Sequence, residues 1–128
     1  MSDDVTVDRP EFGDYPAGTE VFSAKFDAED FQDPMWLDGR EYPDGAVITI
    51  RRGKTPPQGW VLRHRNLSDL DRADLVFRMH ADEAALDALY DLNDAAFDEF
   101  VTAWDRDGGV TPGKSPRSTK RSKPTKRR

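Results

Sequence analysis

The stretch from Asp82 to Trp104 has the most regular alternation of apolar and polar positions in the chain. Its apolar residues recur at steps of three and four, which predicts that they line one side of a helix. They are Leu86, Leu89, Leu92 or Asn93, Ala96, Phe97, Phe100, Val101 and Trp104. Acidic residues recur at the same steps on the other side, namely Asp87, Asp91, Asp94 and Asp98. We therefore expect one helix, or two that meet at Asn93, with an aromatic stripe, an acidic back and a stop at Gly108-Gly109.

Strand patterns come earlier in the chain. Apolar and polar residues alternate over Glu20–Phe26, which is the period of a half-buried strand. The segment Ala46–Arg51 is rich in β-branched residues and predicts a second strand. After Pro56 and Pro57, which cannot continue a central strand, Trp60–His64 is expected to return as its partner. These segments predict a small antiparallel sheet.

Turn and cap signals complete the expected fold. The pair Asp38-Gly39 lies between short apolar runs in Met35–Tyr42, as in a tight hairpin. Asn66 or Ser68 is expected to cap a helix that ends near His80, and Asp82 begins the next one. The expected class is α+β, with a small antiparallel sheet in the front half followed by two to three amphipathic helices.

Composition limits the size of the folded part. Of 128 residues only 36% are hydrophobic and 34% are charged, so the core must be modest. We expect a flexible leader over 1–19, one domain over 20–110 and a disordered basic tail over 111–128. No apolar run is long enough for a membrane span, no signal peptide is visible, and the absence of cysteine excludes disulfides and thiolate metal sites. A cytosolic protein is expected.

Charge is distributed unevenly along the chain. Eight of the 19 basic residues and none of the 25 acidic ones lie in 111–128. Residues 1–110 contain the remaining 11 basic residues and all 25 acidic ones, so this body has a net charge of −14. An acidic body with a basic tail could bind two different partners, or the tail could fold back on the body or serve solubility alone.

No catalytic pattern is convincing. The segment from Gly108 to Ser115 matches the spelling of a phosphate-binding loop, but it follows a polar helix end and precedes a tail without apolar periodicity. His64 and His80 lack the spacing of metal ligands on one helix face, and the carboxylates are dispersed along a solvated side. We therefore expect no enzyme activity, no cofactor and no metal.

A nucleic-acid role is the weaker alternative. Five cations, Arg51, Arg52, Lys54, Arg63 and Arg65, make the far end of the expected sheet locally basic, and the tail adds eight more. The body is strongly acidic, however, and the tail has no aromatic residues on which bases could stack. Dedicated nucleic-acid recognition is not expected.

The aromatic stripe is the main candidate site. A small domain buries a lower share of its surface, so part of the stripe should stay exposed and bind an amphipathic helix. The predicted partner-binding residues are Leu89, Phe97, Phe100, Val101 and Trp104, with Asp87, Asp91, Asp94 and Asp98 as the soluble back. The competing interpretation is that the stripe only covers the sheet and the preceding helix.

The region from Ala81 to Ser118 resembles the C-terminal region of tail assembly chaperones of long-tailed phages of actinobacteria. Ala103-Trp104, Gly109-Val110 and Gly113-Lys114-Ser115 stand where that family has an Ala-Trp pair and a Gly-Val-x-x-Gly-[Lys/Glu]-Ser segment. The resemblance implies a non-enzymatic helper that coats the helical tape measure protein in the host cytoplasm and is not retained in the virion. It also implies a longer frameshifted product, and Pro112-Gly113-Lys114 is compatible with slippery codons (CCG-GGA-AAG or CCG-GGA-AAA). The alternatives are a regulatory or nucleic-acid-associated protein acting through its tail, and a minor virion structural protein.

Overall fold

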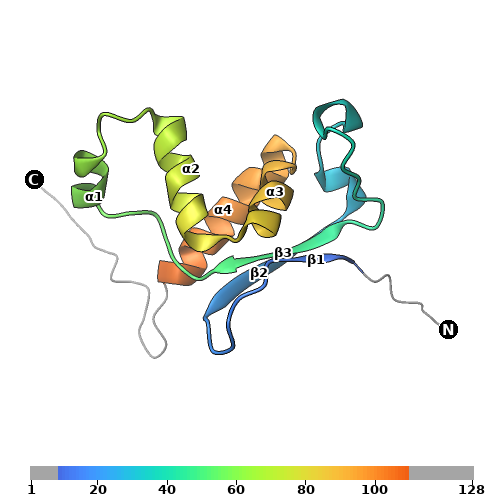
Figure 1. Ribbon diagram of the computed structural model, residues 1–128, viewed down its shortest axis with the longest axis horizontal. Coiled ribbons are helices and arrows are strands. Elements are labelled where there is room, and N and C mark those ends of the chain that lie inside the picture. Colours follow the sequence, from blue (N-terminus) through green and yellow to red (C-terminus); the bar gives the residue numbers. More distant parts are fainter. Residues whose placement is uncertain (1–8, 110–128) are drawn as a thin grey trace, which may run out of the picture.

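The computed structural model describes residues 9–109, which form a three-stranded sheet with helices packed on one face (Figure 1). The strands are β1 (Glu11–Phe12), β2 (Val21–Phe26) and β3 (Ala46–Arg51). The helices are α1 (Gln58–Arg63), α2 (Asp69–His80), α3 (Glu83–Tyr90) and α4 (Asp94–Gly109), with single 3₁₀ turns η1 (Ala28–Asp30) and η2 (Pro34–Trp36). Helices α2, α3 and α4 cover the sheet, whereas α1 stands apart beyond one end of it (Figure 1). The expected α+β class, with a small sheet followed by helices, is confirmed.

The central strand is β3, which pairs on both sides. It runs antiparallel to β2, with Ser23 opposite Thr49, and parallel to β1, with Phe12 opposite Ile48. Its inward side chains Ile48 and Ile50 are fully buried, as the β-branched run predicts. The strands expected at 20–26 and 46–51 are therefore confirmed, but the sheet is mixed rather than wholly antiparallel.

The parallel strand comes from the segment that was expected to be a flexible leader. Pro10 accepts a backbone hydrogen bond from Val47 (2.8 Å), and the Tyr15 hydroxyl donates to the Thr49 carbonyl (2.7 Å). Between them, Gly13 has φ +113°, and a Cβ there would lie 2.1 Å from the Thr49 oxygen. The prediction of a flexible leader over 1–19 is thus wrong for this part, because its backbone is paired with β3.

The segment Trp60–His64 is helical, so its prediction as a returning strand is wrong. Pro57 caps α1 in an extended conformation, and the His64 amide donates to the Trp60 carbonyl at 3.1 Å. The rings of Trp60 and His64 stack with centroids 4.0 Å apart, which is a contact between helical neighbours at i and i+4. A short apolar run does not distinguish the period of a helix from that of a strand. Here the stacking of Trp60 on His64 favours the helix.

The expected hairpin around Asp38-Gly39 is a turn without flanking strands. Both residues have positive φ, 51° and 88°, and the Arg40 amide donates to the Leu37 carbonyl at 2.9 Å. The turn was predicted correctly, but the apolar residues beside it, Leu37 and Tyr42, are buried against the body instead of pairing as strands.

Side-chain caps separate the helices. The Ser68 hydroxyl accepts from the Asp71 amide (3.0 Å), and the Asp82 carboxylate accepts from the Ala85 amide (2.9 Å). Asn93 accepts from the Ala96 amide at 2.9 Å, so the long periodic stretch is divided into α3 and α4 at the residue where the pattern allowed a junction. None of the helices described here is long and apolar enough to cross a membrane.

Candidate functional site

The predicted aromatic stripe lies mostly inside the protein. Leu89 is 0% exposed, and Phe100 and Trp104 are each 1% exposed, so the prediction that these three contact a partner is wrong for this conformation. Phe100 packs edge-on against Phe22 of β2 with ring centroids 5.4 Å apart. The Trp104 indole N–H donates to the Arg51 carbonyl at 2.9 Å. The sheet and α2 together cover more of the stripe than the size of the domain led us to expect.

The other two predicted partner-binding residues, Phe97 and Val101, are half-buried. Phe97 packs edge-on against Phe77 with centroids 5.7 Å apart. Val101 reaches the surface at a groove between helices. Of the five predicted residues, Val101 is therefore best placed to contact a partner.

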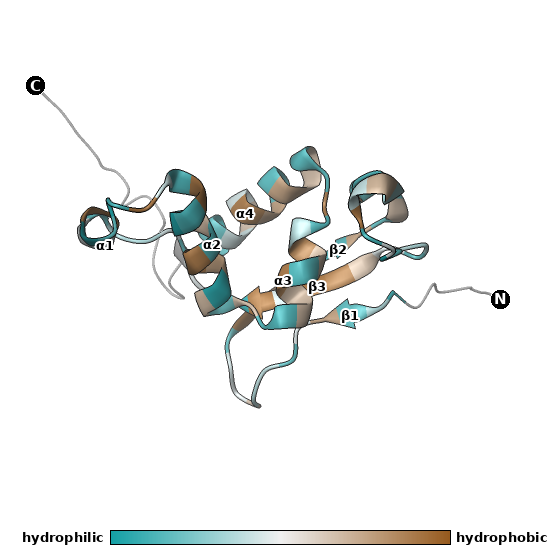
Figure 2. Cartoon of the chain, turned by 45° about the horizontal axis from the view of Figure 1, so that its top comes forward, coloured by the Kyte–Doolittle hydropathy of each residue, from teal (hydrophilic) through white to brown (hydrophobic). Residues whose placement is uncertain are grey.

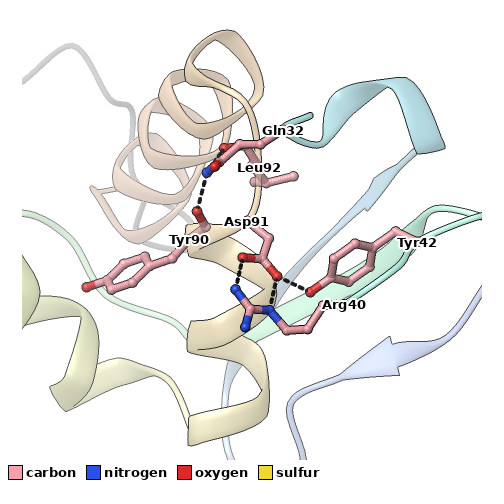
Figure 3. Close-up of polar contacts among 6 residues, drawn as sticks. All are labelled: Gln32, Arg40, Tyr42, Tyr90, Asp91 and Leu92. Atoms are coloured by element: carbon pink, nitrogen blue, oxygen red, sulfur yellow. Dashed lines mark hydrogen bonds and ion pairs between the residues drawn. The ribbon is translucent and has the colours of Figure 1, made fainter. Parts of the chain in front are cut away.

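The acidic back is exposed at Asp87, Asp94 and Asp98, but Asp91 is buried, and its expected role in the soluble face is wrong. Its carboxylate accepts hydrogen bonds from Arg40 Nε and Nη2, at 2.7 and 2.8 Å, and from the Tyr42 hydroxyl at 2.5 Å (Figure 3). Burial, together with hydrogen bonding to Asp91, raises the pKa of the Tyr42 phenol above its usual value. Hydrogen bonding to Asp91 also raises the pKa of the Arg40 guanidinium.

This cluster fastens the segment from residue 28 to residue 42 to the junction of α3 and α4. The Gln32 side-chain amide donates to the Tyr90 carbonyl (2.7 Å) and the Leu92 carbonyl (3.2 Å), as Figure 3 shows. Asn93 donates its backbone N–H to the Asp30 carbonyl at 2.8 Å. Because both Asp91 oxygens are engaged, we interpret the carboxylate as a structural tie rather than a general base.

A groove of about 210 Å³ with an apolar lining lies between α1, α2 and α4, and we call it the apolar groove. Eight of its ten lining residues are apolar. They are Pro56, Trp60, Val61, Ala73, Val76, Phe77, Val101 and Trp104, and the two polar residues are Thr55 and Arg72. Ala73 is an exposed position on α2, so it lies where an incoming group would enter.

Polar ties hold α1 in place along the apolar groove. The Thr55 amide donates to the Asp105 carboxylate at 2.7 Å, which fixes the loop before α1 to α4. From the other side, Arg72 of α2 donates to the Leu67 and His64 carbonyls, at 2.7 and 3.2 Å. Helix α1 itself has no buried residue. Its apolar side chains are therefore anchored at both ends and left half-covered, so the groove stays open.

Further apolar side chains are exposed on the same helices. Leu62 of α1 is 59% exposed, and Leu70 and Met79 of α2 are 83% and 52% exposed. Both helices carry hydrophobic stretches beside polar ones in Figure 2. Two more exposed side chains, Met35 and Trp36, lie on η2, at the opposite end of the molecule from α1 (Figure 1).

The histidines and glycines have structural contacts. His80 Nδ1 lies 2.8 Å from the Val76 carbonyl, and its ring packs edge-on against Trp104 at 5.1 Å between centroids. Gly108, the first glycine of the phosphate-loop spelling, belongs to α4 and packs against Gly53. The Gly113-Lys114-Ser115 part of that spelling lies outside the described residues. Within residues 9–109, no three histidine or acidic side chains group as metal ligands would.

Comparison of the chain with models of known protein families, with curated proteins and with solved structures gives no match. The apolar groove itself was missed at the level of sequence. The signal that could have revealed it is the pairing of Trp60 with His64 four residues later after Pro57, which is typical of a short helix.

Proposed function

We propose that this protein is a non-enzymatic tail assembly chaperone that binds the helical tape measure protein of a long-tailed phage and keeps it soluble during tail tube assembly. The observation that carries the proposal is the apolar groove, which lies open between α1, α2 and α4. Grooves of this kind receive the apolar side chains of an amphipathic helix. The family itself comes from the resemblance over Ala81–Ser118.

The dimensions of the groove favour a side chain of a partner over a free small molecule. Its volume of about 210 Å³ is below the roughly 300–1,000 Å³ of ordinary small-molecule sites. A single Leu or Phe side chain from a helix matches this volume better. Several exposed apolar residues also lie on α1 and α2, which border the groove. Such a site binds reversibly, as a chaperone that must later release its client requires.

One residue of the Ala-Trp pair that carries the family resemblance has a structural role at the groove. Trp104, the second residue of the Ala-Trp pair, lines the apolar groove while its indole N–H bonds the end of β3. It therefore supports the groove from within instead of gripping the partner from outside. The surplus negative charge of the body keeps the complex soluble. A longer frameshifted form of the same chain is proposed as a second partner, with the host cytoplasm as the location.

The test is a co-expression of the chain with the tape measure protein and a pull-down from the soluble fraction. Ala73→Gln places a larger polar side chain at the exposed entrance of the groove, and Ala84→Gln makes the same change at an exposed position of α3 outside it. We expect Ala73→Gln to lose most of the bound tape measure protein and Ala84→Gln to retain it, with equal melting temperatures. Retention by both variants would overturn the assignment of the site.

A further inference from the structure

The segment from residue 45 to residue 68 is the most positive part of the described structure. It contains Arg51, Arg52, Lys54, Arg63 and Arg65 and no acidic residue, although the body as a whole is strongly acidic. The same segment contributes Thr55, Pro56, Trp60 and Val61 to the apolar groove. One wall of the groove is therefore carried on a cationic stretch.

Within residues 9–109, four of these cations have no carboxylate partner, and one of the four, Arg51, has its guanidinium over the Tyr15 ring, 5.4 Å from the ring centroid. Lys54, Arg63 and Arg65 are exposed, and Arg65 donates only to the Leu62 carbonyl, at 2.8 Å. In contrast, Arg72 at the groove forms an ion pair with Asp69. The cations with neither a carboxylate nor an aromatic ring as partner thus lie in the loop before α1 and at the end of α1.

Three acidic residues near the groove are already engaged. The Asp105 carboxylate accepts from the Thr55 amide, and Asp107 pairs with Arg52 at 3.0 Å. Asp69 is the partner of Arg72. The three exposed cations therefore remain available for carboxylates that a bound partner would bring.

We propose that the apolar groove selects a partner helix whose apolar stripe is flanked by Asp or Glu, with those carboxylates facing Lys54, Arg63 and Arg65. This inference rests on the proposed function and adds the chemistry of the client segment that is recognised. The apolar side chains provide the affinity, and the opposite charges set the orientation and raise the association rate. Screening over about 10 Å at 0.1 M salt makes the preference dependent on ionic strength.

The same cations could attract nucleic acid, but the site favours a peptide. The segment that carries the cations lines an apolar groove and offers no row of exposed aromatic faces for base stacking. Its one ring on α1, Trp60, is half-buried and already stacked on His64.

Two labelled synthetic helical peptides with the same Leu/Phe stripe test the inference, one with Glu flanks and one with Lys flanks. Fluorescence polarisation with the full chain should show about tenfold tighter binding of the Glu peptide at low salt, with the difference shrinking at high salt. Arg63→Glu should remove most of that preference. Lys25→Glu, the same reversal at an exposed position of β2, should leave it unchanged.

The Ala73→Gln variant separates the two proposals. Equal binding of both peptides to the wild-type chain, lost in both cases with Ala73→Gln, would overturn the charge preference while the groove remains the binding site. Binding of neither peptide, together with an undiminished pull-down of the tape measure protein by Ala73→Gln, would overturn both. Binding of an oligo(dT) probe that is weakened by Arg63→Glu but not by Ala73→Gln would assign the cations to nucleic acid and overturn the inference.

Discussion

Gly108 of α4 lies against the backbone of Gly53, the second residue after β3, so closely that a Cβ at Gly108 would be 1.5 Å from the Gly53 carbonyl oxygen. The contact brings the end of α4 onto the end of the central strand. Beside it, Gly53 itself lies against the rings of His80 and Trp104, because a Cβ there would be 2.5 Å and 3.2 Å from their atoms. Gly108, the first residue of the double glycine that was predicted to stop the helix, is therefore also a packing site.

The first prediction concerns this contact. Gly108→Ala should lower the free energy of unfolding by about 2 kcal/mol, because the backbone of Gly53 must move to admit the methyl group. The control is Gly59→Ala in α1, where nothing lies within 4 Å of the added Cβ. That change should be neutral or stabilising by up to about 1 kcal/mol. Urea unfolding of both variants is the measurement, and equal stabilities would contradict the close packing.

The second prediction is an asymmetry in the buried ion pair. Arg40→Gln should lower the melting temperature more than Asp91→Asn does. Asp91 has 4% of its side chain exposed and Arg40 has 43%. Loss of the arginine therefore strands a buried carboxylate, whereas loss of the carboxylate leaves a guanidinium that water can reach. Thermal unfolding of the two variants at neutral pH decides this, and the reverse order would show that the arginine is the group that depends on the pair.

The third prediction is a loss of stability in alkali. Burial is the largest cause of the raised pKa at both Tyr42 and Tyr90, and hydrogen bonds to Asp91 and Asp74, respectively, add to it. Because the folded pKa exceeds the unfolded value of 10.0, these contributions are complete below about pH 10 and are lost as the pH rises above it.

Phenolate absorbance and unfolding measured from pH 9 upward test whether stability falls in this direction. Tyr42→Phe should cost about 1 kcal/mol at neutral pH, since it removes the hydroxyl bonded to Asp91. It should also make stability fall less steeply in alkali than in the wild type. Phenols that all titrate near pH 10 in the folded protein would contradict the prediction.

A fourth prediction separates the chaperone from a protein that acts through its tail. Truncation after Gly113 removes all eight basic residues of the tail and leaves the apolar groove intact. The truncated chain should still hold the tape measure protein in a pull-down. A protein that binds through the tail would instead lose its ligand and most of the salt dependence of binding.

The fifth prediction concerns the virion. Mass spectrometry of purified particles should detect the tape measure protein but not this chain, because a chaperone is released when tube subunits replace it. The chain should be found in the lysate of infected cells, which serves as the control. Its presence in particles at a stoichiometry comparable with other tail proteins would favour the alternative of a minor structural component.

Local patterns predicted the elements that show a regular alternation, a run of β-branched residues or a capping side chain. The alternation in Glu20–Phe26 and the β-branched run of Ala46–Arg51 became β2 and β3. Ser68 and Asp82 cap the helices that follow them. Each of these signals acts over a few residues, through backbone conformation or one side-chain hydrogen bond, so the sequence alone shows it.

Tertiary structure decided the pairing of β1 with β3 and the burial of Asp91. Asp91 shares the helical spacing of Asp87, and only the approach of Arg40 and Tyr42, about 50 residues earlier, makes it a buried ion-pair member. The same holds for the candidate site. The sequence determined that apolar residues recur along the last helices, but the share left open to a partner depends on which distant segments cover them. The sheet and α2 enclose Phe100 and Trp104, whereas the polar ties of α1 leave Val101 at an open groove.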